Sequence, residues 1–110
     1  MAYQDVDKIF TAEAIRDTSS HNSVSSKSGE FMAKTIVVEN GLNQQATFQL
    51  QGSTDESTWY DIGSTFNVAA SSNDFQTVET YFPFYRVVAS CGTSPTSGVL
   101  DVCIIKARGI

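Results

Sequence analysis

The residues with the clearest chemical potential lie in the stretch QGSTDESTWYDIG, which spans positions 51–63. It holds three carboxylates, Asp55, Glu56 and Asp61. Hard cations such as calcium bind about six to eight oxygen ligands, so a stretch of this composition could form a metal loop. Its spacing does not match an EF-hand loop, and the glycine that such a loop requires is absent. We therefore expect a solvated hairpin turn and no metal site.

The aromatic pair in the same stretch, Trp59 and Tyr60, could instead form a platform for a sugar ring. Adjacent residues of a strand point to opposite faces of the sheet, so only one of the two can lie in the core. Trp59 is the only tryptophan, and in a small sandwich such a residue usually anchors the packing. We therefore predict that Trp59 lies in the core and that Tyr60 faces solvent, a sugar or a neighbouring subunit.

Catalytic chemistry has little support in the sequence. His21 is the only histidine, and it lies in a serine-rich segment where a nearby serine is expected by chance. The G-x-S-x-G motif of many hydrolases is absent. Glycoside hydrolysis needs two carboxylates across a cleft, and a small sandwich offers little cleft. We expect no enzyme, no catalytic residues and no cofactor.

The two cysteines, Cys91 and Cys103, are expected to be unbridged. Thiols of a protein made in the cytosol usually act as small buried hydrophobic groups. The two residues flank a predicted hairpin without lying opposite each other in its simplest register. With one distant histidine they make no zinc site either, because zinc needs about three or four convergent ligands.

Length and charge limit the class of protein. The chain has 110 residues, the size of one domain with one core. Its formal net charge is −5 and its seven Lys and Arg residues are scattered, whereas nucleic acid or an anionic membrane would need clustered positive charge. No apolar run approaches the roughly 18 residues of a membrane span, and the first ten residues lack the apolar core of a signal peptide. We expect neither nucleic acid nor a membrane as a partner, and no export signal.

Alternating apolar and polar residues predict a series of short strands from Phe31 onward. Phe48 and Leu50 share one face of a strand, as do Phe66 and Val68. Pro83 must interrupt the longest β-rich segment, because proline cannot donate to a β-ladder. About seven or eight such strands, separated by turn residues, predict an all-β antiparallel β-sandwich of immunoglobulin-like or jelly-roll topology.

In the N-terminal segment the periodic spacing of apolar residues is weaker. Residues 6–17 fit a helix only loosely, and an extended arm or strand fits as well. The serine-rich residues 18–30 are typical of a loop or of an edge strand around Val24. We therefore divide the chain into an N-terminal arm (1–22) and a β-sandwich domain (23–110), and expect the arm to order against a neighbour.

The last predicted strand, residues 98–107, is apolar on both faces. Leu100, Val102 and Ile104 share one face, and Val99, Cys103 and Ile105 share the other with Asp101. A strand of this kind is either central in its sheet or covered by something outside the domain.

A second aromatic cluster, YFPFYR, occupies residues 81–86. Its alternation places large rings on both faces of a strand, which is more than one thin core requires. It is either a wide strand that crosses the core or part of a subunit interface, where Tyr, Phe and Arg are enriched.

Much of the chain resembles small β-sandwich proteins of tailed bacteriophages and prophages. The resemblance covers about residues 23–107 and consists of a strand ending in a turn, a hairpin, a further strand and a final turn. In this sequence those elements are Asn40-Gly41-Leu42, Gln51-Gly52-Ser53 with Asp55 and Trp59, Tyr85-Arg86-Val87, and Pro95 to Leu100. None of them carries a catalytic signature.

The resemblance implies a structural virion protein, assembled in the cytoplasm of the bacterial host. A capsid decoration (cement) protein fits best, because a single compact domain with an arm is enough to clamp neighbouring capsomers. A tail or neck component is one alternative, and a carbohydrate-binding module that stacks a sugar on Tyr60 or Trp59 is another.

The expected partners are further copies of the chain, which would form a homo-oligomer, and other virion proteins such as the major capsid or tail proteins. We predict contact residues in the arm and in the aromatic segments: Ile9, Phe10, Ile15, Tyr60, Tyr81, Phe82, Phe84, Tyr85 and Arg86.

Overall fold

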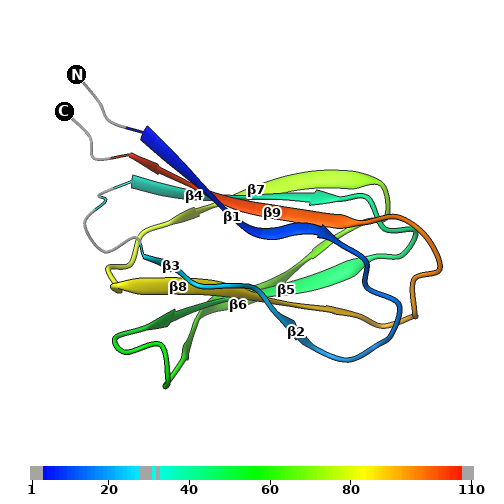
Figure 1. The fold of residues 1–110 in the computed structure, drawn as a ribbon, viewed down its shortest axis with the longest axis horizontal. Helices are drawn as coiled ribbons and strands as arrows, with labels where there is room; N and C mark the ends of the chain where they lie inside the picture. Colours follow the sequence, from blue (N-terminus) through cyan, green and yellow to red (C-terminus); the bar gives the residue numbers. More distant parts are fainter. Residues whose placement is uncertain (1–3, 28–30, 32, 108–110) are drawn as a thin grey trace.

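The computed structural model describes residues 4–27, 31 and 33–107, and within them the chain forms nine strands (Figure 1). They are β1 (Gln4–Glu13), β2 (His21–Asn22), β3 (Ser26–Lys27), β4 (Ala33–Asn40), β5 (Ala46–Ser53), β6 (Tyr60–Val68), β7 (Ser72–Val78), β8 (Phe84–Cys91) and β9 (Leu100–Ala107). No helix long and apolar enough to cross a membrane occurs among these residues. The all-β prediction is confirmed.

The described strands form two antiparallel sheets packed face to face, seen as the upper and lower layers of Figure 1. The first sheet has the order β1-β9-β4-β7, and the second has the order β2-β8-β5-β6, with β3 also paired to β8. We call them the first and the second sheet. Their packing confirms the predicted sandwich.

The strand pairing distinguishes between the two predicted topologies. β2 and β3 act as one interrupted strand along β8, because Ser23 between them donates its amide to the Val87 carbonyl at 2.9 Å. The Ser23 hydroxyl oxygen also accepts the Val87 amide at 2.9 Å. The pairs are then nested, first strand with last, second with second-last, and so inward to β5 with β6. A long hairpin rolled into two sheets in this way is a jelly roll.

Side chains that alternate along each strand fill the space between the sheets. On β5, β8 and β9 every second residue is buried, and burial of these apolar side chains is the main stabilising term of such a fold. The largest core side chains come from both sheets: Ile36, Val38, Phe48, Tyr85, Val87, Leu100, Val102 and Ile104.

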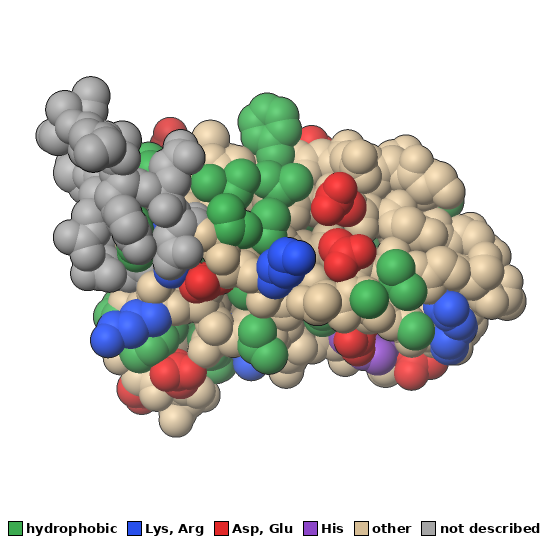
Figure 2. Space-filling view, turned by 45° about the horizontal axis from the view of Figure 1, so that its top comes forward, with side chains coloured by type: hydrophobic (Ala, Val, Ile, Leu, Met, Phe, Trp, Pro, Cys, Tyr) green, Lys and Arg blue, Asp and Glu red, His purple; other side chains and the backbone are tan. Residues whose placement is uncertain are grey.

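The last strand, β9, lies between β1 and β4 and is therefore central in its sheet, as one of the two predicted alternatives required. Leu100, Val102 and Ile104 face the core, while Cys103 and Ile105 lie half-buried on the opposite face. Figure 2 looks obliquely onto this outer face and shows a group of hydrophobic side chains there.

The structure corrects the prediction of an N-terminal arm for residues Gln4–Glu13. These residues form β1, which pairs with β9 at the edge of the first sheet. Ile9, Phe10 and Ile15 are 3%, 5% and 1% exposed and belong to the core. The weak local pattern has a physical cause, because register shifts between Lys8 and Phe10 and between Phe10 and Glu13 break the alternation. Residues 1–3 lie outside the described part of the chain.

Candidate interaction surface

The acidic stretch forms the hairpin between β5 and β6, as predicted. The Asp55 carboxylate accepts the amides of Ser57 and Thr58 at 2.9 and 3.0 Å, and the Ser53 hydroxyl accepts the Glu56 amide at 2.9 Å. These backbone hydrogen bonds from Thr58 and Ser57 hold the pKa of Asp55 below its ordinary value. The carboxylate thus closes a turn, and no group of metal-binding side chains occurs among the described residues.

Trp59 lies outside the core, which corrects the prediction that it joins the two sheets. The guanidinium carbon of Arg86 stands 4.3 Å from the centroid of the indole ring. Arg86 Nε also donates to the side-chain oxygen of Gln51 at 2.8 Å, and Gln51 donates in turn to the Asp61 carboxylate at 2.9 Å. Trp59 and Arg86 therefore begin a polar row across the outer face of the second sheet.

Strand parity explains the position of Trp59. In β6, Ile62, Phe66 and Val68 pack in or against the core. Tyr60 shares their even parity, so the side chain of the preceding residue points away from the core. The sequence already contained this signal in the spacing between residue 59 and the apolar residues of β6.

Tyr60 extends the inner face of the second sheet beyond the core. Its ring stacks on Phe82 with centroids 6.1 Å apart, and Phe82 meets the edge of the buried Tyr85 ring at 6.2 Å. Gly52 provides the space, because a Cβ atom at this position would lie 2.5 Å from the Phe82 ring. Tyr60 keeps 53% of its surface exposed.

Tyr81 is the most exposed large hydrophobic residue of the described chain, at 69%. The Lys34 ammonium lies 4.9 Å from the centroid of its ring and 5.1 Å from that of Tyr85. Lys34 is itself buried and donates to the Phe31 carbonyl at 3.1 Å. A cation against an aromatic face is attractive, so Lys34 helps to hold Tyr81 in place.

We call Tyr60, Tyr81 and Phe82 together the aromatic end. Tyr60 and Phe82 stack on each other and Tyr81 precedes Phe82 in the chain, and all three of these predicted contact residues are partly or largely exposed. Phe84 and Arg86 are half-buried on the outer side of β8, on the face opposite the buried Tyr85.

Four predicted contact residues are corrected by the structure. Tyr85 is fully buried, and Ile9, Phe10 and Ile15 are core residues, so none of them can touch a partner while the domain keeps this fold. Sequence reasoning missed the position of Trp59 outside the core and the buried Lys34 beside Tyr81, whose burial no local pattern indicated.

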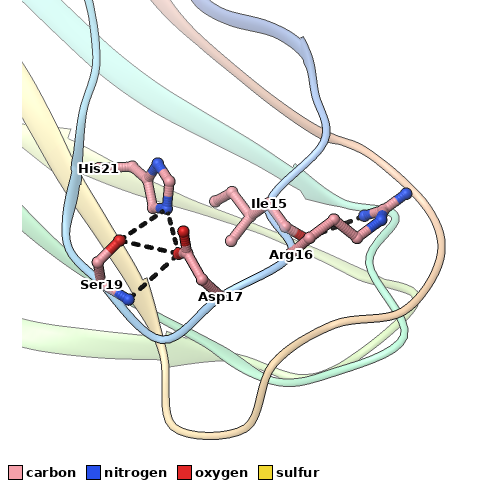
Figure 3. A network of polar contacts seen from close by, with 5 residues as sticks. All are labelled: Ile15, Arg16, Asp17, Ser19 and His21. Carbon is pink, nitrogen blue, oxygen red and sulfur yellow. Dashed lines mark hydrogen bonds and ion pairs between the residues drawn. The ribbon is translucent and has the colours of Figure 1, made fainter.

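A serine, a histidine and an aspartate do meet in the loop before β2 (Figure 3). His21 Nε2 lies 2.7 Å from Asp17 Oδ1, and the Ser19 hydroxyl donates to the same carboxylate oxygen at 2.9 Å. The hydrogen bond from His21, followed by that from Ser19, holds the pKa of Asp17 below its ordinary value. In a catalytic triad the serine and the carboxylate occupy different imidazole nitrogens. Here Asp17 and Ser19 both approach Nε2, so the cluster closes a loop and makes no relay.

Comparison with known proteins finds similarity in structure only. No protein-family model and no curated protein matches the sequence. The PBSX exported protein XepA superposes with a TM-score of 0.75 and 15% identity over 96% of this chain, which spans only 38% of the XepA chain. The SPBc2 prophage-derived protein YomS gives 0.66 and 9%, covering 97% of this chain and 95% of YomS. A Bacillus endospore appendage protein, from disulfide-linked pili, gives 0.61 and 16%, covering 97% of this chain and 88% of that one. These matches show a shared fold.

Proposed function

We propose that the chain is a non-enzymatic structural protein of a phage particle. In this proposal it is a capsid decoration protein that stabilises the particle by protein–protein contacts, made through the aromatic end. Its partners are other virion proteins, with the major capsid protein first among them.

The observation that carries the proposal is the exposed aromatic end, in which Phe82 is held by contacts to its neighbours. Tyr60 and Phe82 stack on each other, and the Phe82 amide donates to the Tyr85 hydroxyl at 2.8 Å. Large aromatic side chains held in one conformation lose little entropy on binding and dominate many protein interfaces. A surface of this kind is suited to docking on a repeated partner.

The shared fold supports the same class of function. Two of the similar structures are a prophage-derived protein and a PBSX exported protein, and a third is a subunit of an assembled pilus. We place decoration ahead of a tail or neck role because a single domain with one contact surface is sufficient to bind repeated sites on a shell.

A carbohydrate-binding role is the second candidate, and one observation favours it. Sugar sites combine an aromatic face with planar polar groups, and Trp59, Arg86, Gln51 and Asp61 form such a row on the second sheet. Arg86 covers one face of the indole ring, so only the other face could stack on a sugar.

Purified particles of the phage or prophage that encodes the chain provide the test. The protein should be present at a constant ratio to the major capsid protein, and immunogold labelling should decorate heads. The Tyr60→Ser/Tyr81→Ser double variant should be incorporated at least about tenfold less than the wild type, because it loses two aromatic anchors. Val24→Ser is the matched control, because Val24 is an equally exposed apolar residue between β2 and β3.

Three other outcomes would change the proposed function or its contact surface. Labelling confined to tails or necks would replace decoration by the alternative virion role. Equal incorporation of the double variant would exclude the aromatic end as the contact surface. Absence from particles, combined with glycan binding that is lost in Trp59→Ala, would favour the carbohydrate-binding role.

A further inference from the structure

The two sheets have four edges in the described part of the chain, and three of these edges are irregular. β1 has register shifts between Lys8 and Phe10 and between Phe10 and Glu13. β6 has a register shift opposite the segment from Phe48 to Leu50. The edge along β8 consists of β2 and β3, which have two residues each. Bulges and short strands of this kind keep the free edge of a sheet from pairing with another chain.

The fourth edge, β7, is regular. It runs along the free edge of the first sheet, and its seven residues pair with β4 in one unbroken register, from Ser72 opposite Asn40 to Val78 opposite Lys34 (Figure 1). It contains no proline and, in Asp74, a single charged residue. A long, regular edge strand is a template on which another strand can be added. β7 is therefore the edge at which a second chain could extend the sheet.

The Phe75 amide indicates which backbone groups of β7 point away from the sheet. It donates to the Asp74 carboxylate at 2.8 Å, at an exposed position, so it takes no part in the ladder with β4. Backbone groups alternate in direction along an antiparallel strand, so Asn73, Phe75 and Thr77 all present their amides and carbonyls away from β4. The middle donor of these three is thus occupied by a side chain of the strand itself.

Asp74 also places a charge on the inner side of this edge. Its partner on β4 is the core residue Val38, and Asp74 itself is half-buried. An inward-pointing charge is one way in which proteins keep an edge strand unpaired. A strand added to β7 would have to displace this carboxylate from the Phe75 amide. One side chain thus supplies the protection that the other three edges obtain from their irregular backbone.

We propose that β7 is a latent site of strand addition for a second copy of the chain, and that Asp74 keeps this site closed. While the carboxylate caps the Phe75 amide, the edge stays unpaired. When the carboxylate is removed, two copies pair through β7 and their first sheets become one continuous sheet. The inference does not use the aromatic end and does not rest on the proposed function.

The residues of β7 suit antiparallel pairing with a copy of the same strand. Such a contact is isologous and has a two-fold axis. With Phe75 on the axis, all seven residues pair, so that Asn73 faces Thr77 of the second copy and position 74 faces Gln76. The outward groups of residues 73, 75 and 77 then form three pairs that exchange two backbone hydrogen bonds each. The two Phe75 rings meet on the outer face as a cross-strand aromatic pair.

Asp74 opposes this arrangement by its charge as well as by its cap. The two Asp74 side chains would lie diagonally across the axis, about 7–8 Å apart, and would repel each other. Nearby carboxylates do not meet in this way. Glu79 faces Ser71 of the second copy, and Glu39 on β4 is three strand spacings, or about 14 Å, from its own copy. Removal of the Asp74 carboxylate therefore removes both the cap and the repulsion.

Sedimentation velocity of the isolated full chain at about 1 to 500 µM tests the proposal. Asp74→Ala should raise the association constant at least about tenfold over that of the wild type. Asp74→Val should do the same, because valine suits a strand and accepts no hydrogen bond, and it serves if the alanine variant folds poorly. Glu79→Ala is the matched control, because it removes an equal charge from an exposed residue directly after β7, and it should sediment like the wild type.

A proline on the edge shows whether the new contact uses β7. Thr77→Pro removes an outward amide and keeps the ladder with β4, and proline is tolerated at such edge positions. Combined with Asp74→Ala, it should return the association constant to the wild-type value. Hydrogen exchange of residues 72–78 in Asp74→Ala should slow as concentration rises, because the free amides become bonded.

The proposal is overturned if both Asp74 variants associate no more strongly than the wild type, or if their gain survives the addition of Thr77→Pro. It is equally overturned if Glu79→Ala produces the same gain, because net charge and not the cap would then control association. Incorporation into particles is measured separately, so failure of this proposal and failure of the proposed function can be told apart.

Discussion

The hydroxyl of Tyr85 donates a hydrogen bond to the Thr80 carbonyl at 2.6 Å, although the tyrosine ring lies fully buried in the core. The same hydroxyl accepts the Phe82 amide at 2.8 Å. One core side chain thus fixes both ends of the short segment that carries Tyr81, so the position of the aromatic end depends on core packing.

Tyr85→Phe should lower the free energy of unfolding by about 1–2 kcal/mol, because it leaves the Phe82 amide and the Thr80 carbonyl without their partner. Chemical denaturation measures this loss. Tyr81→Phe removes a hydroxyl from the exposed ring four residues earlier and should leave stability unchanged. An equal effect of both variants would contradict the anchoring role of Tyr85.

Trp59→Ala should lower the free energy of unfolding by only about 1 kcal/mol, because the indole stacks on Arg86 at the surface and leaves no core cavity. Phe48→Ala, at a fully buried position, should cost about 3–5 kcal/mol. Urea denaturation followed by circular dichroism compares the two. A comparable loss of unfolding free energy for both variants would indicate that Trp59 packs in the core.

Asp7 links stability to pH through Lys106, whose ammonium lies 2.9 Å from its carboxylate. Burial acts to raise the pKa of Asp7, but hydrogen bonds from Lys106 and Ser26 and the charge of Lys106 outweigh it, so the pKa is lowered. The stability that this pair contributes is therefore fully present above the ordinary aspartate pKa of about 3.9 and is lost as the pH falls through the lowered value.

Asp7→Asn should lower the free energy of unfolding at neutral pH by about 1–2 kcal/mol, less than for a fully buried pair because Asp7 is 35% exposed. When the pH falls from about 4 to about 2, the free energy of unfolding of this variant should also decrease less than that of the wild type. Urea denaturation at both ends of this range measures the difference. Glu79→Gln, at an exposed site, should keep the wild-type pH dependence.

Thiol labelling should separate the two cysteines, which are both free. Cys91 is buried and Cys103 only half-buried, so iodoacetamide should modify Cys103 first in dilute native protein, as read by mass spectrometry. Burial raises the pKa of both thiols, helped by Asp17 at Cys91 and by Glu39 at Cys103. The thiolate fraction near neutral pH is therefore small, and both rates should rise steeply with pH. Faster labelling of Cys91 would contradict the assigned burial.

Local alternation in the sequence was enough to determine most of the strands from β4 onward and the faces of their apolar residues. Period-two patterns located the core residues of β5 and β9, and Pro83 separated β7 from β8 as expected, because proline lacks the amide that a ladder needs. The turn chemistry of Ser53 and Asp55 was equally local, since both side chains bond to amides only two or three residues away.

Only the tertiary structure decided which strands share a sheet. β1 pairs with β9 at the other end of the chain, and the burial of Ile9 and Phe10 follows from that pairing. No local pattern encodes it, because a partner across the sheet is chosen by how well both strands bury their apolar faces.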